Sequence, residues 1–250
     1  MKNVKLKVAK VAKKNSVTGY VVYEGKSMIN GDDIVGILTT KKSDNEKTGD
    51  MPQLWILPKN VNPNEATKTG EDSSVCGECP HRHHLGGGCY VTVFQAPLSI
   101  WKAYQRGNYP KTNGWKNEVI GRRVRLGAYG DPFAIPQDIL NSITDASLIG
   151  NTSYTHQWKE DSSLKEISMA SVDSLEEKQQ AIENGWRTFR VMEENPSGEY
   201  LLDDDEIICP NVTKAINCAD CGLCSGNKIQ AKNIAIPVHG SKKKRFKKVA

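Results

Sequence analysis

The sequence has no long uninterrupted run of apolar residues, and no stretch approaches the roughly 18 to 20 that a membrane-spanning helix needs. The first residues, MKNVKLKVAKVAKKNSVTGY, also lack the apolar core and small-residue cleavage site of a secretory signal. Two enzyme motifs are missing as well, the Gly-x4-Gly-Lys phosphate loop and the Gly-x-Ser-x-Gly nucleophile elbow. We therefore expect a cytoplasmic protein with no membrane contact, and neither P-loop hydrolysis nor serine acyl transfer is supported.

Basic charge is concentrated at the two ends of the 250-residue chain. The net charge is +5, yet the first fourteen and the last ten residues each carry six basic groups and no acidic one. The remainder is therefore net acidic. The last ten residues, SKKKRFKKVA, predict a basic disordered tail over residues 241–250. The alternative is that Lys242–Lys248 make weak, non-specific contact with nucleic acid.

Residues 1–60 are predicted to form a small N-terminal β region. Three short runs there are rich in β-branched and aromatic residues and are separated by Gly, Asn and Asp: VTGYVVYEG, DDIVGILTT and QLWIL. They predict an antiparallel sheet over about residues 17–58. The following segment, PKNVNPNEATKTGEDSS, is interpreted as an irregular connector.

Residues 61–240 alternate strand-like and helix-like segments and are predicted to form the core. The strand-like segments are RRVRLGAYG, NTSYTHQW, EISMASV, WRTFRVM and NIAIPVHG, and the helix-like ones are APLSIWKAYQRG, PQDILNSITDA and SLEEKQQAIENG. Short strand-helix-strand repeats predict parallel strands with helices outside them. The predicted fold class is α/β, with a partial (β/α) barrel-like core of parallel strands. A doubly wound open sheet is the alternative.

Polar residues at the ends of these strands predict where ligands bind, because both folds bind them at the C-terminal ends of the strands. The candidates are Asp131, Tyr154, Thr155, His156, Gln157, Asp173 and Arg190. For any one of them taken alone, a structural role as a helix cap or a buried hydrogen-bond donor is favoured over catalysis. Tyr154, His156 and Gln157, in YTHQW, are predicted to face a substrate, a small molecule or a nucleotide.

The C-terminal cysteines predict a metal centre. Seven cysteines in a cytosolic chain favour metal ligation over disulfides, because the cytosol keeps thiols reduced. Cys209, Cys218, Cys221 and Cys224 have the spacing C-P-x7-C-x2-C-x2-C. Four thiolates complete a tetrahedral zinc site or hold a 4Fe–4S cluster. The continuous C-x2-C-x2-C winding favours the iron cluster, with zinc as the alternative.

Cys76, Cys79 and Cys89 form a second, N-terminal group with the spacing C-x2-C-x9-C. Three histidines lie in its long spacer: His81, His83 and His84. If one of them completes the set, the site is a closed Cys3His zinc site. If none does, a 4Fe–4S cluster has one iron free to bind a substrate or cofactor. The spacing leaves both possibilities open.

Nearly the whole chain resembles a family of phage- and prophage-encoded, cysteine-rich proteins. The matching motifs, in chain order, are KTGDMPQLWIL, CGECPHR, CYV, LGAYGDP, YTHQW, GWRTFRV, the C-terminal cysteine run and IPVHG. The resemblance implies a phage or mobile-element setting, and hence the cytoplasm of a host. It does not imply a particular activity.

A more distant resemblance is to radical S-adenosylmethionine enzymes, in which three cysteines hold a cluster with one open iron. Those enzymes often carry an auxiliary four-cysteine cluster near the C-terminus. Tyr90 stands beside the last cysteine of the first group, where they commonly have an aromatic residue. GAYGDP resembles their glycine-rich motif, which implies that Gly127, Gly130 and Asp131 contact S-adenosylmethionine. Their usual spacing is C-x3-C-x2-C, from which this chain departs.

The leading hypothesis is a phage-type iron–sulfur protein with one or two 4Fe–4S clusters. It would be a redox or radical-SAM-like enzyme acting on a small molecule or nucleotide. The main alternative is a non-catalytic protein in which zinc at both cysteine groups stabilises the fold and which binds nucleic acid or a host factor.

Overall fold

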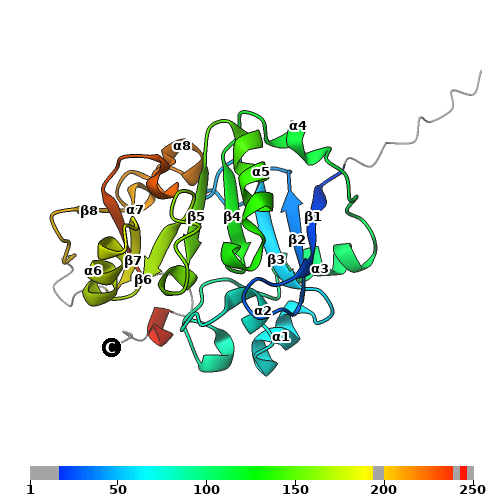
Figure 1. Ribbon diagram of the computed structural model, residues 1–250, viewed down its shortest axis with the longest axis horizontal. Coiled ribbons are helices and arrows are strands. Elements are labelled where there is room, and N and C mark those ends of the chain that lie inside the picture. Colours follow the sequence, from blue (N-terminus) through cyan, green and yellow to red (C-terminus); the bar gives the residue numbers. More distant parts are fainter. Residues whose placement is uncertain (1–16, 194–199, 239–242, 247–250) are drawn as a thin grey trace, which may run out of the picture.

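The computed structural model of the chain describes residues 17–193, 200–238 and 243–246. The described residues form one sheet of nine strands in the order β1-β2-β3-β4-β5-β6-β7-β9-β8 (Figure 1). The strands are β1 Gly19–Lys26, β2 Asp33–Thr39, β3 Gln53–Pro58, β4 Val124–Tyr129, β5 Asn151–Thr155, β6 Met169–Val172, β7 Thr188–Met192, β8 Glu206–Ile208 and β9 Asn233–Pro237. The predicted α/β class is confirmed.

The sheet combines an antiparallel part with a parallel part. Strands β1, β2 and β3 pair antiparallel, as predicted for the N-terminal region. From β3 onward every pairing is parallel, and β3 itself pairs with β4, so the N-terminal strands continue the core sheet. The order rises without reversal as far as β7, unlike a doubly wound sheet, and the sheet does not close, because β1 and β8 are its edges.

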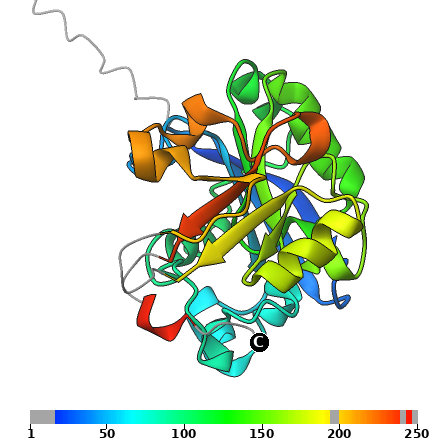
Figure 2. The same ribbon diagram turned by 90° about the vertical axis from the view of Figure 1, so that its left-hand side faces the viewer.

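Helices join the parallel strands and cover one face of the sheet. The α-helices are α1 Pro63–Thr69, α2 Ser73–Cys76, α3 Ala96–Gln105, α4 Trp115–Val119, α5 Gln137–Ser147, α6 Leu175–Glu183, α7 Pro210–Lys214 and α8 Cys218–Cys221. Helices α5 and α6 lie on the same side of the strands (Figure 2). Buried Leu140, Ile143 and Ala181 of these helices join the main apolar core, and we call this side of the sheet its outer face.

The opposite, inner face of the sheet has a smaller apolar core. Met169 and Ile234 are fully buried there against Cys224, and Tyr154 and Phe189 pack around them half-buried. The segment from β8 to β9, which carries four of the cysteines, therefore supplies part of the packing on this face.

The connector predicted to be irregular is partly helical, so that prediction was wrong. Helix α1 begins after Asn62, whose side chain accepts hydrogen bonds from the backbone N–H groups of Asn64 and Glu65. Pro63 occupies the first turn, and Gly70 ends the helix with φ 89°. Asparagine as the cap, proline in the first turn and glycine just past the end are the usual signals of a short helix.

The two basic ends of the chain lie largely outside the described residues. The predicted N-terminal basic segment falls within residues 1–16, and residues 241–242 and 247–250 of the predicted tail are also outside. In between, Phe246 is buried, and its ring stacks on that of His81 with the centroids 5.0 Å apart. Part of the tail therefore packs against the first cysteine loop. Within the described ranges, no helix has the length and apolar character to span a bilayer.

Substituting Gly130 with alanine is expected to destabilise the protein by at least about 3 kcal/mol, because both backbone conformation and packing require glycine. Gly130 has φ 82°, and a Cβ there would lie 2.7 Å from the carbonyl oxygen of Ile56. Gly31 is the matched control: its φ is 80°, but no atom lies within 4 Å of the added Cβ. Gly31→Ala should cost only about 1 kcal/mol. Urea unfolding of both variants measures the difference, and equal costs would contradict the packing at Gly130.

Candidate functional site

The three N-terminal cysteines are brought together by a loop that doubles back on itself at the C-terminal edge of the sheet. Cys76 ends α2, and the N–H of Cys79 donates to the Cys76 carbonyl at 3.2 Å. The chain then returns, so that the N–H of Cys89 donates to the His81 carbonyl at 2.9 Å. Gly87 allows this return, because a Cβ there would lie 2.4 Å from the His81 carbonyl carbon.

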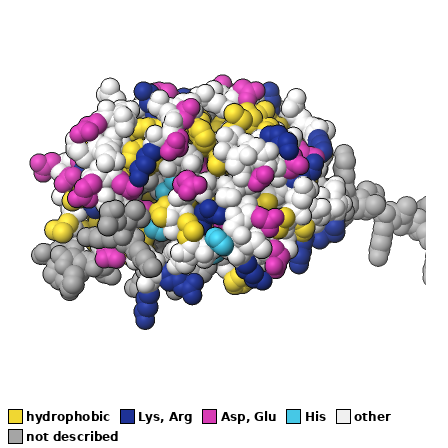
Figure 3. All heavy atoms as spheres, turned by 60° about the horizontal axis from the view of Figure 1, so that its bottom comes forward, with side chains coloured by type: hydrophobic (Ala, Val, Ile, Leu, Met, Phe, Trp, Pro, Cys, Tyr) yellow, Lys and Arg dark blue, Asp and Glu magenta, His cyan; other side chains and the backbone are white. Residues whose placement is uncertain are grey.

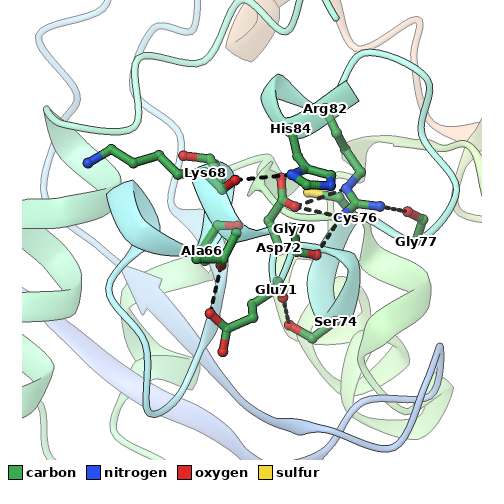
Figure 4. Close-up of polar contacts among 12 residues, drawn as sticks. Ala66, Lys68, Gly70, Glu71, Asp72, Ser74, Cys76, Gly77, Arg82 and His84 are labelled. Atoms are coloured by element: carbon green, nitrogen blue, oxygen red, sulfur yellow. Dashed lines mark hydrogen bonds and ion pairs between the residues drawn. The ribbon is translucent and has the colours of Figure 1, made fainter. Parts of the chain in front are cut away.

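A buried arginine holds the loop in place (Figure 4). The Arg82 guanidinium donates to the Asp72 carboxylate at 2.7 and 3.0 Å. It also donates to the carbonyl oxygens of Gly70 and Gly77, at 2.5 and 3.1 Å. Asp72 and Arg82 are both buried. This network ties the cysteine loop to the end of α1 and the start of α2.

The thiols of the first group share one poorly hydrated environment. All three cysteines are half-buried. Burial, and then the negative charge of Cys79 and Cys89, raise the pKa of Cys76 well above its ordinary value. Burial and the charge of Cys89 do the same to the pKa of Cys79. The thiols of Cys76 and Cys79 would be neutral at pH 7, and bringing these two to the thiolate state needs a compensating positive charge such as a metal.

Two of the three predicted substrate residues lie at this group. His156 follows β5, and its Nε2 lies 3.8 Å from Cys79 Sγ. The Gln157 amide donates to the Cys76 carbonyl at 3.5 Å. Burial lowers the pKa of His156 to about 4, so its imidazole is neutral at pH 7.

Tyr154 lies instead at the other cysteine group. Its ring is 4.3 Å from that of Phe189, and it packs against the buried cluster that contains Cys224. Burial raises the pKa of Tyr154 well above its ordinary value. The structure therefore separates Tyr154 from His156 and Gln157, which were predicted to act with it.

The residues predicted to contact S-adenosylmethionine contact other parts of the chain instead. Asp131 is buried, and one of its carboxylate oxygens accepts from Phe133 N at 3.0 Å and Thr155 Oγ1 at 2.7 Å. The other oxygen accepts from the backbone N of His156 at 2.8 Å. Burial raises the pKa of Asp131 to about 6.

The two glycines beside Asp131 are also explained by close packing within the chain. A Cβ on Gly127 would lie 2.6 Å from the Gly130 carbonyl oxygen, and one on Gly130 would meet Ile56. These glycines pack against protein atoms and leave no cradle between them. No observation at Gly127, Gly130 or Asp131 supports an S-adenosylmethionine site.

The three loop histidines point in different directions. His81 Nε2 lies 2.8 Å from Asp173 Oδ2, at the end of β6, so this strand-end candidate does reach the site. The His84 ring packs over Gly70, with its Nδ1 3.0 Å from the Lys68 carbonyl oxygen. His83 is half-buried in the turn His83–Leu85. On this face of the molecule, histidines reach the surface among scattered acidic and basic side chains (Figure 3).

The remaining strand-end candidates have structural partners. The Arg190 guanidinium donates to both carboxylate oxygens of Glu206, at 2.8 and 2.6 Å. Both side chains are buried. This ion pair joins β7 to β8. Thr155 donates a hydrogen bond to Asp131, as described above. Arg190 and Thr155 therefore support the fold.

The four C-terminal cysteines surround a small cavity against the inner face. Cys209 directly precedes α7, Cys218 and Cys221 bound α8, and Cys224 follows the turn at Gly222. All four line a cavity of about 20 Å³ together with Tyr154 and Leu223. Burial, and then the charges of the other three thiolates, raise the pKa of Cys224 to about 12. This environment again favours neutral thiols unless a cation is bound.

Two arginines hold this second cysteine segment to the sheet. Arg123 donates to the Ala219 carbonyl at 3.0 Å, and Arg187 donates to the Leu223 and Gly226 carbonyls at 3.0 and 2.9 Å. Helices α2 and α8 lie at opposite ends of the strands (Figure 1). The two cysteine groups are thus separate sites.

Arg125 on β4 interacts with a residue next to the first cysteine group and with a cysteine of the second. Its guanidinium donates to the Tyr90 hydroxyl at 2.8 Å, next to Cys89 in the sequence. Burial raises the pKa of Cys218, and the positive charge of the same guanidinium lowers it in part. A cation in this position favours thiolate at Cys218.

Comparisons of the chain with protein-family models, with curated proteins and with solved structures gave no match. The resemblances drawn from sequence motifs therefore stay predictions.

Proposed function

We propose that the protein is an iron–sulfur protein with two cysteine-held centres. The first, at the C-terminal edge of the sheet, performs one-electron chemistry on a small molecule or nucleotide. Its ligands are Cys76, Cys79 and Cys89. The second is structural or auxiliary, and its ligands are Cys209, Cys218, Cys221 and Cys224.

The gathering of four thiols around one small cavity carries this proposal. Cys209, Cys218, Cys221 and Cys224 all line that cavity, and the burial of Cys224 favours its neutral thiol unless a cation is bound. Four thiolates hold a 4Fe–4S cluster or complete a tetrahedral zinc site. The continuous C-x2-C-x2-C winding of Cys218, Cys221 and Cys224 favours the iron cluster.

The first centre is the proposed reactive one because of its position and its incomplete cysteine set. It lies where the parallel strands end, which is where ligands bind in such sheets. A 4Fe–4S cluster supplies one-electron transfer and, with three cysteines, an iron without a protein sulfur ligand. Arg82 holds the loop, while His156 and Gln157 contact Cys79 and the Cys76 backbone from the end of β5.

The rest of the architecture is consistent with this arrangement. The sequential parallel strands, with α5 and α6 on the outer face, support a partial barrel-like scaffold. In this scaffold the second centre lies on the inner face. The proposal places the protein in a reducing compartment such as the cytoplasm, where thiols are kept reduced and can bind metal.

Purification without oxygen tests the proposal. We expect a brown protein with absorption near about 400 nm and about eight irons per chain. Elemental analysis measures iron and zinc in the same sample. A colourless protein with two equivalents of zinc would contradict the proposal and favour the zinc-stabilised, non-catalytic alternative. A folded chain without any transition metal would exclude both.

A further inference from the structure

We infer that His81, His156 and Asp173 form a mononuclear site for a divalent transition-metal ion beside the first cysteine group, with no cysteine among its ligands. One ligand atom from each of the three residues lies within 4.8 Å of the other two. The residues come from the cysteine loop, the exit of β5 and the exit of β6, so the fold brings them together from distant parts of the sequence.

The geometry is close to that of a loaded site. Two ligand atoms about 2.1 Å from an ion and at right angles around it are about 3.0 Å apart. His81 Nε2 and Asp173 Oδ2 are 2.8 Å apart. The rings of His81 and His156 meet edge to face, with their centroids 6.0 Å apart and their planes at 68°. Small side-chain movements would suffice to close the three ligands around an ion.

A second observation supports a cation site here. The Asp173 side chain is only 1% exposed, and its Oδ1 is buried without a hydrogen-bond partner. An unpartnered buried carboxylate oxygen is costly, and a bound cation would remove that cost. The residue is fixed in place, because its backbone N donates to Glu177 Oε2 at 2.9 Å and Ser174 caps α6 directly after it.

The donor set determines which metal the site prefers. Two imidazoles and one carboxylate suit Fe²⁺, Co²⁺ or Zn²⁺, whereas thiolates select iron–sulfur clusters or zinc. Three protein ligands leave coordination positions for water or for an oxygen of a substrate. Phe246 stacks on one face of the His81 ring and shields that side from solvent. The site is therefore an open metal centre next to the first cysteine group.

Cobalt binding tests the inference on the full chain, purified without oxygen and with the cysteine groups holding their own metal. We expect one additional equivalent of Co²⁺, with visible d–d absorption and no sulfur-to-cobalt charge-transfer band. Asp173→Asn and His81→Gln should each weaken this binding by at least about 100-fold, since removing even an outer-shell partner costs 10- to 100-fold. His84→Gln is the matched control and should bind Co²⁺ as the unmodified chain does, because His84 packs over Gly70.

The cobalt experiment separates failure of this inference from failure of the iron–sulfur proposal. The inference does not require iron at the cysteines, and iron content is measured independently in every variant. The absence of an extra Co²⁺ equivalent would overturn the inference, as would a charge-transfer band or binding that persists in both variants. Circular dichroism checks folding. His81→Gln decides the outcome if Asp173→Asn does not fold, because a glutamine amide can still donate to Asp173.

Discussion

Replacing Arg82 with methionine is expected to destabilise the protein by about 3–5 kcal/mol and to release the iron that we propose for the first cysteine group. The substitution leaves the Asp72 carboxylate buried without a counter-charge, and breaking one side of a buried ion pair costs about this much. It also frees the carbonyls of Gly70 and Gly77, which the guanidinium ties together. The loop that carries Cys79 and Cys89 would then lose its anchor. Urea unfolding and iron analysis measure the two effects.

Two further variants show whether the buried charge is the cause. Lys68→Met removes an exposed ion pair with Glu65, of which both side chains are more than half exposed, and should cost at most about 0.5 kcal/mol. Adding Asp72→Asn to Arg82→Met removes the orphaned charge and should recover part of the lost stability. If Arg82→Met costs no more than Lys68→Met, the network in Figure 4 does not hold the loop.

The strands and longer helices could be predicted because local sequence determines them. Strands β4, β5 and β7 are rich in β-branched and aromatic residues, and Ser174 caps α6, which begins at Leu175. The Ser174 hydroxyl accepts from the backbone N of Glu177, and the Glu177 carboxylate accepts from the backbone N of Asp173. The missed helix α1 is short, and its signals lie within a polar segment that resembles a loop.

The two cysteine groups could be predicted from spacing, but the contacts around them could not. His81 and Asp173 are 92 positions apart, and only the adjacency of the strand ends makes them neighbours. The same holds for Phe246 on His81 and for Arg125 between the groups. Sequence alone offered no signal for Arg82, because an arginine beside a metal loop usually remains exposed.

The candidate residues after the strands show a second limit of sequence reasoning. A polar residue at a strand end can line a pocket or close a local hydrogen-bond network, and the sequence does not distinguish the two. Asp131 accepts three hydrogen bonds from the chain, while Asp173 keeps a buried oxygen without a partner. The distinction lies in which donors the fold brings near, and it separates a structural carboxylate from a candidate ligand.

Replacing Cys221 with serine is expected to remove the metal of the second centre and to lower the free energy of unfolding by at least about 4 kcal/mol. Structural metals contribute on the order of 10 kcal/mol to folding. The segment they would hold has little apolar packing, because the inner-face core consists of three buried residues with half-buried neighbours, and Arg123 and Arg187 hold the segment through its backbone carbonyls. Without the metal, the buried thiols around the cavity remain as neutral groups. Iron per chain and urea unfolding measure the two losses.

Cys79→Ser is the matched variant, since it makes the same atomic change in the first group. It should also remove about half of the iron, because each proposed cluster holds four of about eight irons. It should cost less stability than Cys221→Ser, because Arg82 and Asp72 hold the first loop independently of a metal. Equal losses of stability would mean that both centres are structural, which would remove the basis for placing the chemistry at the first group. A larger loss for Cys79→Ser would invert the assignment and make the cavity at Cys224 and Tyr154 the reactive site.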